Sequence, residues 1–388
     1  MRKIAIVTRK LIPGGIEKSL ISMVNEMCNL KYDVTVFVVE QGGEFERDIP
    51  SNVTIKPIFK DNIATKKKVV SLLLEKKIIK AVSVIKNIIL SNFTKNIYKS
   101  MYYATKNMEV NKELYDLVIS YHSPISFSAV YSINNIKSVK KAIWIHTELE
   151  KCKKELIKFK KLYNEYDMIF AVSNGVKKQF IDIFPEYKNK VDIYYNSISI
   201  KEIREKAKEN IVFNYEKGAF KIVTVGRLSN EKGQDLIPYI IKKLNIKEIK
   251  VNWYLIESGE LRTQIEENAK KCCVEDSIIY LGNKKNPYPY IEMCDIYVQP
   301  SREESFGLTI SEAKCLCKPI VATNTIGARE QIQDGFNGLL SEHDVKTISD
   351  KIINLIEDKE LLNKLIINLS NEDINKSDEI RKIEYIIS

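Results

Sequence analysis

The sequence predicts an α/β protein with two domains, each built on a doubly wound parallel sheet. Apolar strand patterns alternate with helical patterns along most of the chain, an order typical of parallel sheets covered by helices. The chain also has 388 residues, 44% of them hydrophobic. This length exceeds the size at which a single hydrophobic core stops growing, so we expect two domains of roughly 190 residues each.

The first domain is expected at residues 1–197. Its predicted strands are apolar runs that end in polar or glycine residues, and they lie at 3–8, 34–39, 53–58, 117–121, 142–145, 168–172 and 191–195. Helical periodicity predicts helices at 16–27 and 151–161. We place the domain boundary after the last of these strands, because the strongly charged segment 201–210 follows it.

The second domain is expected at residues 198–370, followed by a terminal helix within 371–388. Predicted strands lie at 221–225, 253–256, 278–281, 295–298 and 320–323. Predicted helices lie at 288–294, 309–317, 346–368 and 376–387. Both halves therefore show the alternation from which parallel sheets are built.

Composition excludes several classes of protein. The sequence has no run of about 18 apolar residues, and its first three residues lead directly into a strand pattern, so we expect neither a transmembrane span nor a signal peptide. Seven cysteines without a CxxC spacing favour reduced thiols over a metal site or a disulfide framework. We expect a cytoplasmic protein, either free or peripheral on the inner face of the cell membrane.

Positive charge is concentrated in the first half of the chain. Residues 1–200 carry 33 lysines and arginines against 20 acidic residues, whereas residues 201–388 carry 28 against 31. The sequence has no recognition helix, zinc spacing or RNA-binding aromatic pattern, so we do not expect a nucleic-acid partner. The excess of +10 instead favours an anionic membrane surface or a phosphorylated acceptor.

The stretch 61–110 is rich in lysine and has no counterpart in the second half. It carries ten lysines against three acidic residues, interleaved with apolar residues, and it predicts one or two basic amphipathic helices inserted at about 64–106. One interpretation is a pair of helices that pack on the sheet and expose their lysines. The other is a membrane contact, in which the apolar residues enter the lipid interface and the lysines meet anionic headgroups.

A polar segment, 299–307, separates a predicted strand from a predicted helix. Such a turn lies at the carboxyl edge of an open α/β sheet, where ligands bind. Gly307 permits close approach of a ligand, and the amides at the start of the helix, Leu308 to Ile310, favour a phosphate group. Two carboxylates, Glu304 and Glu312, bracket the turn and are better suited to hold sugar or ribose hydroxyls than phosphate.

A second strand-to-helix turn, 226–233, carries two cations between glycines. Arg227 and Lys232 lie five residues apart, so they can converge on one diphosphate, the arginine as a bidentate donor and the lysine as a point charge. The alternative is a solvated loop.

These motifs resemble those of a known family. Glu304-x7-Glu312 around Ser305-Phe306-Gly307-Leu308, followed by Lys318-Pro319 and a strand, resembles the signature of retaining nucleotide-sugar glycosyltransferases of the GT-B type, family four. The resemblance implies two Rossmann-like domains that face each other across a cleft. It also implies that the second domain holds a nucleotide-diphosphate sugar, commonly a UDP-sugar, and that the terminal helix returns to the first domain.

The resemblance also implies roles for individual residues. Arg227 and Lys232 would clamp the donor pyrophosphate, Glu304 would hold the transferred sugar, and Glu312 the ribose. His146, which follows the predicted strand 142–145, would approach the transferring sugar as a fourth catalytic residue. Further donor-binding positions implied in the same way are Gly15, Gly226, Gly282, Asn283, Phe306, Gly307, Leu308 and Thr309, and those on the acceptor side are Gly14 and His122.

One position departs from the family pattern, and the mechanism leaves alternatives open. The family usually has a glycine pair where this chain has Ser258-Gly259, which puts close backbone approach at Ser258 in question. The resemblance implies retention by front-face attack on a glycan or lipid-linked acceptor, and no DxD-like carboxylate pair stands at a strand end, so we expect neither metal nor cofactor. The alternatives are a nucleotide-sugar 2-epimerase or phosphorylase on the same fold, and a non-catalytic subunit at a membrane surface.

Overall fold

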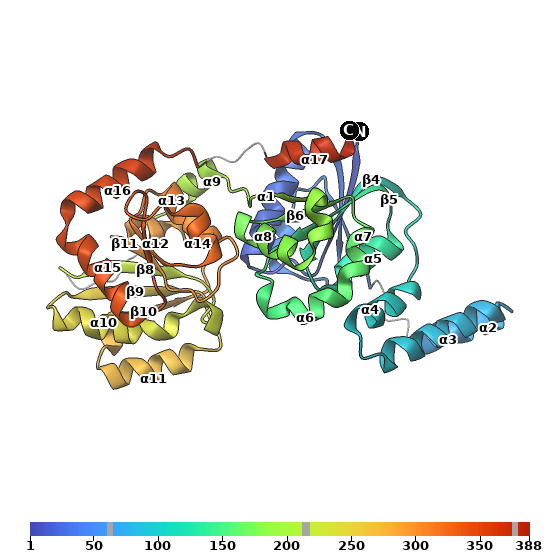
Figure 1. Ribbon diagram of the computed structural model, residues 1–388, viewed down its shortest axis with the longest axis horizontal. Helices are drawn as coiled ribbons and strands as arrows, with labels where there is room; N and C mark the ends of the chain where they lie inside the picture. The colour runs from blue at the N-terminus through green and yellow to red at the C-terminus, as the bar shows by residue number, and fades with distance from the viewer. Residues whose placement is uncertain (60–64, 212–217, 375–378) are drawn as a thin grey trace. The chain divides into compact units, whose positions relative to one another are not determined.

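The computed structural model describes residues 1–59, 65–211, 218–374 and 379–388, and many of its elements are labelled in Figure 1. The chain divides into two compact units, Met1–Ser197 with Ser377–Ser388, and Ile198–Lys376. Each unit contains one parallel sheet with helices on it, which confirms the predicted fold class. The beginning of the lysine-rich stretch, at 61–64, lies outside the described residues.

The first unit is built on a seven-stranded sheet. Its strands are β1 (Lys3–Thr8), β2 (Asp33–Val38), β3 (Thr54–Pro57), β4 (Leu114–Ser123), β5 (Lys137–Ile145), β6 (Met168–Ala171) and β7 (Val191–Ile193). They run in the order β3-β2-β1-β4-β5-β6-β7, and every neighbouring pair is parallel. The order reverses between β1 and β4, which makes the sheet doubly wound and gives it a switch point at that pair.

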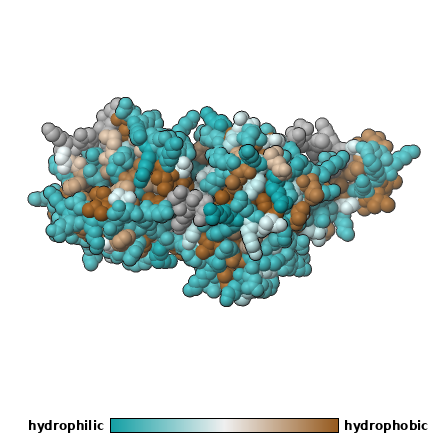
Figure 2. All heavy atoms as spheres, turned by 90° about the horizontal axis from the view of Figure 1, so that it is seen from above, coloured by the Kyte–Doolittle hydropathy of each residue, from teal (hydrophilic) through white to brown (hydrophobic). Residues whose placement is uncertain are grey.

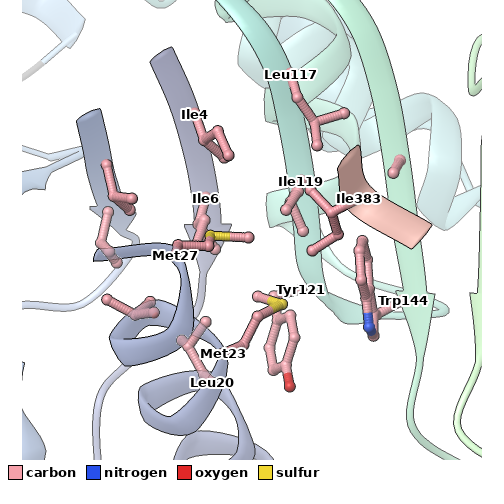
Figure 3. Close-up of a cluster of buried hydrophobic side chains, with 14 of the residues drawn as sticks. Ile4, Ile6, Leu20, Met23, Met27, Leu117, Ile119, Tyr121, Trp144 and Ile383 are labelled. Atoms are coloured by element: carbon pink, nitrogen blue, oxygen red, sulfur yellow. The ribbon is translucent and has the colours of Figure 1, made fainter. Parts of the chain in front are cut away.

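The core of the first unit lies between this sheet and helix α1 (Gly15–Asn29). Ile4 and Ile6 of β1 pack with Met23 and Met27 of α1 (Figure 3). Ile383 enters the same cluster from α17 (Glu379–Ile387), although α17 ends the chain. The terminal helix therefore packs on the first unit because its apolar face completes that unit's core.

Hydrogen bonds fix α17 in this position. Glu379 Oε2 accepts from the backbone amide of Tyr195 at 2.9 Å. Lys382 Nζ donates to the carbonyl oxygen of Ile193 at 2.7 Å and to Glu379 at 2.8 Å. The helix is thus tied to the end of β7 by a carboxylate and an ammonium group as well as by its apolar face.

The remaining helices of the first unit include one correction. They are α2 (Thr65–Leu74), α3 (Ile78–Phe93), α4 (Ile97–Lys106), α5 (Phe127–Asn135), α6 (Lys153–Leu156), α7 (Lys160–Asn164) and α8 (Asn174–Ile183). The single helix predicted at 151–161 is wrong, because a 3-10 turn at Ile157–Phe159 separates α6 from α7. Leu156, Phe159 and Leu162 are all buried at a spacing of three, which fits the three-residue period of a 3-10 helix.

The second unit is built on a six-stranded sheet. Its strands are β8 (Phe220–Val225), β9 (Val251–Ile256), β10 (Ile278–Gly282), β11 (Ile296–Gln299), β12 (Ile320–Thr323) and β13 (Leu339–Ser341). They run in the order β10-β9-β8-β11-β12-β13, again parallel throughout. The switch point of this sheet lies between β8 and β11. The sequence analysis did not predict β13, which has only three residues.

The helices of the second unit are α9 (Ile200–Lys206), α10 (Ile237–Ile246), α11 (Arg262–Cys272), α12 (Tyr288–Met293), α13 (Leu308–Cys315), α14 (Ile326–Gln331), α15 (Val345–Glu357) and α16 (Lys359–Asn371). The single helix predicted at 346–368 is wrong. Asp358 ends α15 and caps α16, since its side chain accepts from the amides of Glu360 and Leu361 at 3.1 and 2.9 Å. Within the described ranges, no helix has the length and apolarity needed to span a bilayer.

Candidate functional site

Two loops meet at the switch point of the second sheet. Residues 226–233 follow β8, and residues 300–307 follow β11, which pairs directly with β8. Both loops leave the carboxyl ends of their strands, so they lie at the edge where doubly wound sheets bind ligands. We call residues 226–233 the first loop and residues 300–307 the second loop.

The two loops are in backbone contact. Gly233 has φ +69°, and a Cβ atom there would lie 2.0 Å from the carbonyl oxygen of Pro300. The amides of Arg302 and Glu303 both donate to the carbonyl oxygen of Glu231, at 2.8 and 3.2 Å. Only glycine fits at position 233 with the loops this close, because any side chain would push them apart.

An ion pair also joins the second loop to the residues just beyond the first. Arg302 donates to both carboxylate oxygens of Asp235 at 2.7 Å, and to the carbonyl oxygen of Asn230 at 2.7 Å. Burial acts to raise the pKa of Asp235, but the bonds and charge of Arg302 outweigh it and hold that pKa below its usual value. The sequence analysis missed both residues, since nothing in their local spacing shows that they pair.

Lys232 and Glu304 form the centre of the site. Lys232 Nζ lies 2.6 Å from Glu304 Oε1, and the two side chains are 23% and 9% exposed. The same carboxylate oxygen accepts from Ser301 Oγ at 3.0 Å and from Gln299 Nε2 at 3.2 Å. Three donors thus converge on Oε1, whereas Oε2 makes no hydrogen bond to the residues that the structure describes.

The amide of Gln299 orients this carboxylate. Gln299 is buried, and its Oε1 accepts from the hydroxyl groups of Tyr297 at 2.7 Å and Thr309 at 3.3 Å. Its Nε2 is therefore turned toward Ser301 and Glu304, to which it donates. Gln299 and Ser301 lie in the polar segment 299–307, but no individual role was predicted for either of them or for Tyr297. The sequence signal that could have identified the site role of Gln299 is its polar side chain at the end of an otherwise apolar strand.

Arg227 lies in the same loop as Lys232 but in a different environment. Its side chain is 71% exposed, and one terminal nitrogen lies 3.6 Å from Glu231 Oε1. Gln234 Nε2 donates to the carbonyl oxygens of Gly226 and Arg227 at 3.0 and 2.9 Å, which fixes the backbone of the loop. The two predicted cations therefore share one loop, with Lys232 paired to Glu304 and Arg227 at the surface.

Helix α13 begins where the second loop ends. Gly307 has φ +82° and precedes the first helical residue, Leu308. The prediction that the amide of Ile310 is available is wrong, because that amide donates to the carbonyl oxygen of Gly307 at 3.0 Å. The amides of Leu308 and Thr309 open the helix and have no acceptor within it, as is general for the first turn of a helix. Phe306 and Leu308 are buried beside them.

Glu312 lies one helical turn further along α13 and is buried. Its Oε1 accepts from the hydroxyl group of Tyr288 at 3.1 Å. Burial and the neighbouring carboxylate raise the pKa of Tyr288 above its usual value, so this hydroxyl stays protonated and able to donate. Glu312 and Glu304 thus have different partners, which fits carboxylates that hold different parts of a ligand.

The loop after β9 contacts the first loop, and the loop after β10 contacts the loop after β9. Asn283 Oδ1 accepts from the amide of Ser258 at 2.8 Å, and the carbonyl oxygen of Gly282 accepts from the amide of Glu257 at 2.9 Å. A Cβ atom at Gly259 would lie 2.3 Å from the carbonyl oxygen of Leu228. The amide of Leu228 also donates to the carbonyl oxygen of Ser258 at 3.2 Å, so the two main chains lie close together at both positions.

In the first unit, the predicted site residues follow β1, β4 and β5. Gly14 precedes α1 and Gly15 begins it, His122 lies at the end of β4, and His146 follows β5. His146 is buried, with its ring centroid 4.5 Å from that of Tyr121. Neither of its ring nitrogens has a hydrogen-bond partner of ordinary geometry among the described residues.

Both histidines are held in the neutral form. Burial, with a smaller contribution from His122, lowers the pKa of His146 to about 3. Burial and then Arg9 lower the pKa of His122. Across the described parts of the chain, no group of three or more histidine, cysteine, aspartate or glutamate side chains is placed to hold a metal ion.

Two doubly wound units in one chain are the architecture of the GT-B glycosyltransferases. A family model described as Glycosyltransferase Family 4 matches residues 13–202, and one described as Glycosyl transferases group 1 matches residues 205–371, so that together they span most of the chain. The chain belongs to glycosyltransferase family four. The second match contains both loops and helix α13.

Individual proteins are similar over part or all of the chain. An uncharacterised glycosyltransferase of Methanocaldococcus jannaschii is 26% identical over 67% of this chain and 73% of its own. The Campylobacter jejuni N-acetylgalactosamine-N,N'-diacetylbacillosaminyl-diphospho-undecaprenol 4-alpha-N-acetylgalactosaminyltransferase is 30% identical over 47% of this chain and 48% of its own. The crystal structure of Anabaena Alr3699/HepE in complex with UDP-glucose has a TM-score of 0.70 at 17% identity and covers 99% of both chains.

Proposed function

We propose that the protein is a retaining glycosyltransferase that moves a sugar from a UDP-sugar to a hydroxyl group of a glycan or lipid-linked acceptor. The observation that carries the proposal is the ion pair between Lys232 and Glu304 at the switch point, where a cation for phosphate and an acceptor for sugar hydroxyls lie 2.6 Å apart. A nucleotide-diphosphate sugar is a ligand that needs both groups next to each other.

Lys232 would donate a hydrogen bond to the diphosphate while it keeps its ion pair with Glu304. An ammonium group has three hydrogen atoms to donate, and only one of them is needed for the carboxylate. The exposed Arg227 and the amides of Leu308 and Thr309 would add positive potential around the same phosphates. Together these groups would stabilise the charge that develops on the leaving phosphate as the glycosidic bond breaks.

The two glutamates would hold the rest of the donor. With three donors on its Oε1, Glu304 would present Oε2 to a hydroxyl group of the transferred sugar. Glu312 would hold the ribose hydroxyls. A glycosidase mechanism is disfavoured, because hydrolases need two carboxyl groups that face each other across the anomeric carbon.

His146 would orient the sugar or the acceptor rather than remove a proton. A general base works best when its pKa lies near the working pH, and the pKa of His146 is lowered to about 3. Front-face attack, in which the leaving phosphate takes the proton of the acceptor hydroxyl, fits a neutral histidine. Since side chains and amides neutralise the diphosphate, we expect activity without a metal ion, and it should survive an excess of chelator.

Similar proteins support the proposed donor and acceptor. The Anabaena HepE structures contain UDP and UDP-glucose, and the name of the Campylobacter jejuni relative gives a diphospho-undecaprenol acceptor. We therefore favour UDP as the nucleotide and an acceptor for surface polysaccharide or glycolipid synthesis. An acceptor carried on lipid would place the enzyme on the inner face of the cell membrane.

A donor experiment separates this proposal from the alternatives. Thermal unfolding with UDP, GDP and their sugars should show stabilisation by uridine compounds, and NMR of the product should show the anomeric configuration of the donor. Conversion of the donor alone to its 2-epimer, or phosphorolysis of a glycan, would favour the other enzymes of this fold. Absence of stabilisation by any nucleotide sugar would favour a non-catalytic subunit.

A further inference from the structure

Helices α2, α3 and α4 are inserted between β3 and β4 and stand apart from the sheet of the first unit (Figure 1). The sequence predicts one or two helices here, and the described residues form three. Helix α4 is fixed to α5, since Asn134 Nδ2 donates to Thr105 Oγ1 at 2.7 Å and Asn135 Nδ2 to the carbonyl oxygen of Thr105 at 3.1 Å. The insertion is thus attached to the unit through α4.

One face of α3 packs on α4. Ala81 and Val84 are its buried residues, and the side chain of Asn87 donates to Asn107 Oδ1 at 3.0 Å. Ser91 and Ser100 exchange hydrogen bonds to each other's carbonyl oxygens at 3.0 and 2.8 Å. These contacts use one side of α3, and its other side is exposed in the part of the chain that the structure describes.

The opposite face of α3 is apolar and exposed. Its residues recur three, four and seven positions apart, which places them in one stripe along the helix. They are Ile78, Ile79, Val82, Ile85, Ile89 and Phe93. Exposure reaches 88% at Ile79 and 83% at Phe93. Sixteen residues make this stripe about 24 Å long, and Leu73 and Leu74 of α2 extend it.

The helices that carry the stripe are positively charged. Between residues 69 and 106 the chain has seven lysines, all exposed, and a single acidic residue, Glu75, whose carboxylate lies 2.6 Å from Lys77 Nζ. Figure 2 shows apolar atoms beside hydrophilic ones at the right-hand end of that view, over α2 and α3. We call the apolar stripe with its lysines the α3 surface.

We infer that the α3 surface docks on a lipid bilayer that contains anionic headgroups. Apolar side chains at this density prefer the acyl boundary to water, and lysines at the edge of the stripe reach headgroups while their methylene chains stay in the interface. A second copy of this chain is a poorer partner, because two surfaces with a net charge of +6 (seven lysines, one acid) would repel each other. The inference does not depend on the transferase activity.

Vesicle flotation of the full chain tests the inference. The protein should float with vesicles of phosphatidylcholine containing about 30% phosphatidylglycerol, and much less with phosphatidylcholine alone. Raising the salt to about 0.5 M should release most of the bound protein, because exposed charges are then screened within a few ångströms. Absence of binding at low salt would overturn the inference.

Two variants distinguish insertion of the stripe into lipid from nonspecific binding through any exposed apolar residue. Ile79→Ser with Phe93→Ser should lower binding to the anionic vesicles at least tenfold, because both side chains are exposed and would enter the lipid. The matched control is Ile246→Ser with Ile367→Ser, which removes two exposed isoleucines of the second unit and should bind like the unmodified chain. Equal binding by both variants would contradict the assignment of this face.

Charge reversal tests the lysines separately. Each lysine near an anionic surface contributes about fivefold to binding. Lys76→Glu with Lys86→Glu, one lysine just before α3 and one beside the stripe, should therefore weaken binding more than tenfold, whereas Lys270→Glu with Lys271→Glu, the same change on α11, should have little effect. A concentration-dependent dimer that Ile79→Ser with Phe93→Ser abolishes, without any vesicle binding, would show instead that the face joins two copies. Failure of these tests would leave the donor-binding proposal untouched.

Discussion

The ion pair of Lys232 and Glu304 gives the sharpest test of the donor site. Lys232→Met keeps most of the side-chain volume and removes the charge. Losing one charge-assisted hydrogen bond costs about 1.5–3 kcal/mol, which corresponds to a roughly 10- to 150-fold higher Kd for UDP. We expect the upper part of this range, because Glu304 is 9% exposed and would stay beside the phosphates with only its two neutral donors.

Titration calorimetry with UDP measures this change directly. The matched control is Lys243→Met, because Lys243 Nζ lies 2.6 Å from Asp350 in the same unit, the same separation as in the site pair. The control should bind UDP within about twofold of the unmodified chain, since its ion pair is half in solvent and outside both loops. A folded Lys232→Met protein with unchanged Kd would refute the diphosphate contact.

Three further results are expected. Gly233→Ala should lower the free energy of unfolding by about 2–4 kcal/mol in urea titrations and weaken UDP binding, because its Cβ atom would meet Pro300 and the residue has positive φ; an unchanged protein would contradict the loop contact. His146 has a folded pKa of about 3 against about 6.5 unfolded, so the unfolded chain binds more protons between these values and stability falls as pH drops through this window. The difference in unfolding free energy between pH 7 and pH 4 should shrink by about 2–3 kcal/mol in His146→Gln, and an equal difference would show that the histidine is accessible to protons. Activity should persist in excess chelator, and loss with rescue by manganese would refute the metal-free mechanism.

The regular elements around the site could be predicted from sequence because their signals are local. The strands that become β8, β11 and β12 are short apolar runs, and Gly307 with the helix after it has a recognisable start. The turns at 226–233 and 299–307 were predicted from local patterns too, and their role in ligand binding stays a prediction.

The contacts between these elements could not be predicted in the same way. Arg302 lies 67 residues from Asp235, and Lys232 lies 72 residues from Glu304, so neither pair shows in any local pattern. They follow from the pairing of β8 with β11, which only the folded sheet establishes. The break at Asp358 was missed for another reason, since a capping aspartate between two amphipathic runs is hard to distinguish from an exposed helical residue.

The glycine contact and the Arg302–Asp235 pair have a consequence for how the donor is recognised. Loops anchored to each other at the main chain, and again by a two-pronged ion pair, have little freedom left to lose when a ligand arrives. The nucleotide should then bind to a preformed site, with fast association and a small entropic cost of ordering the protein. Differences in affinity among donor sugars would then depend on which sugar hydroxyl group donates to Glu304 Oε2. They would depend little on rearrangement of the protein.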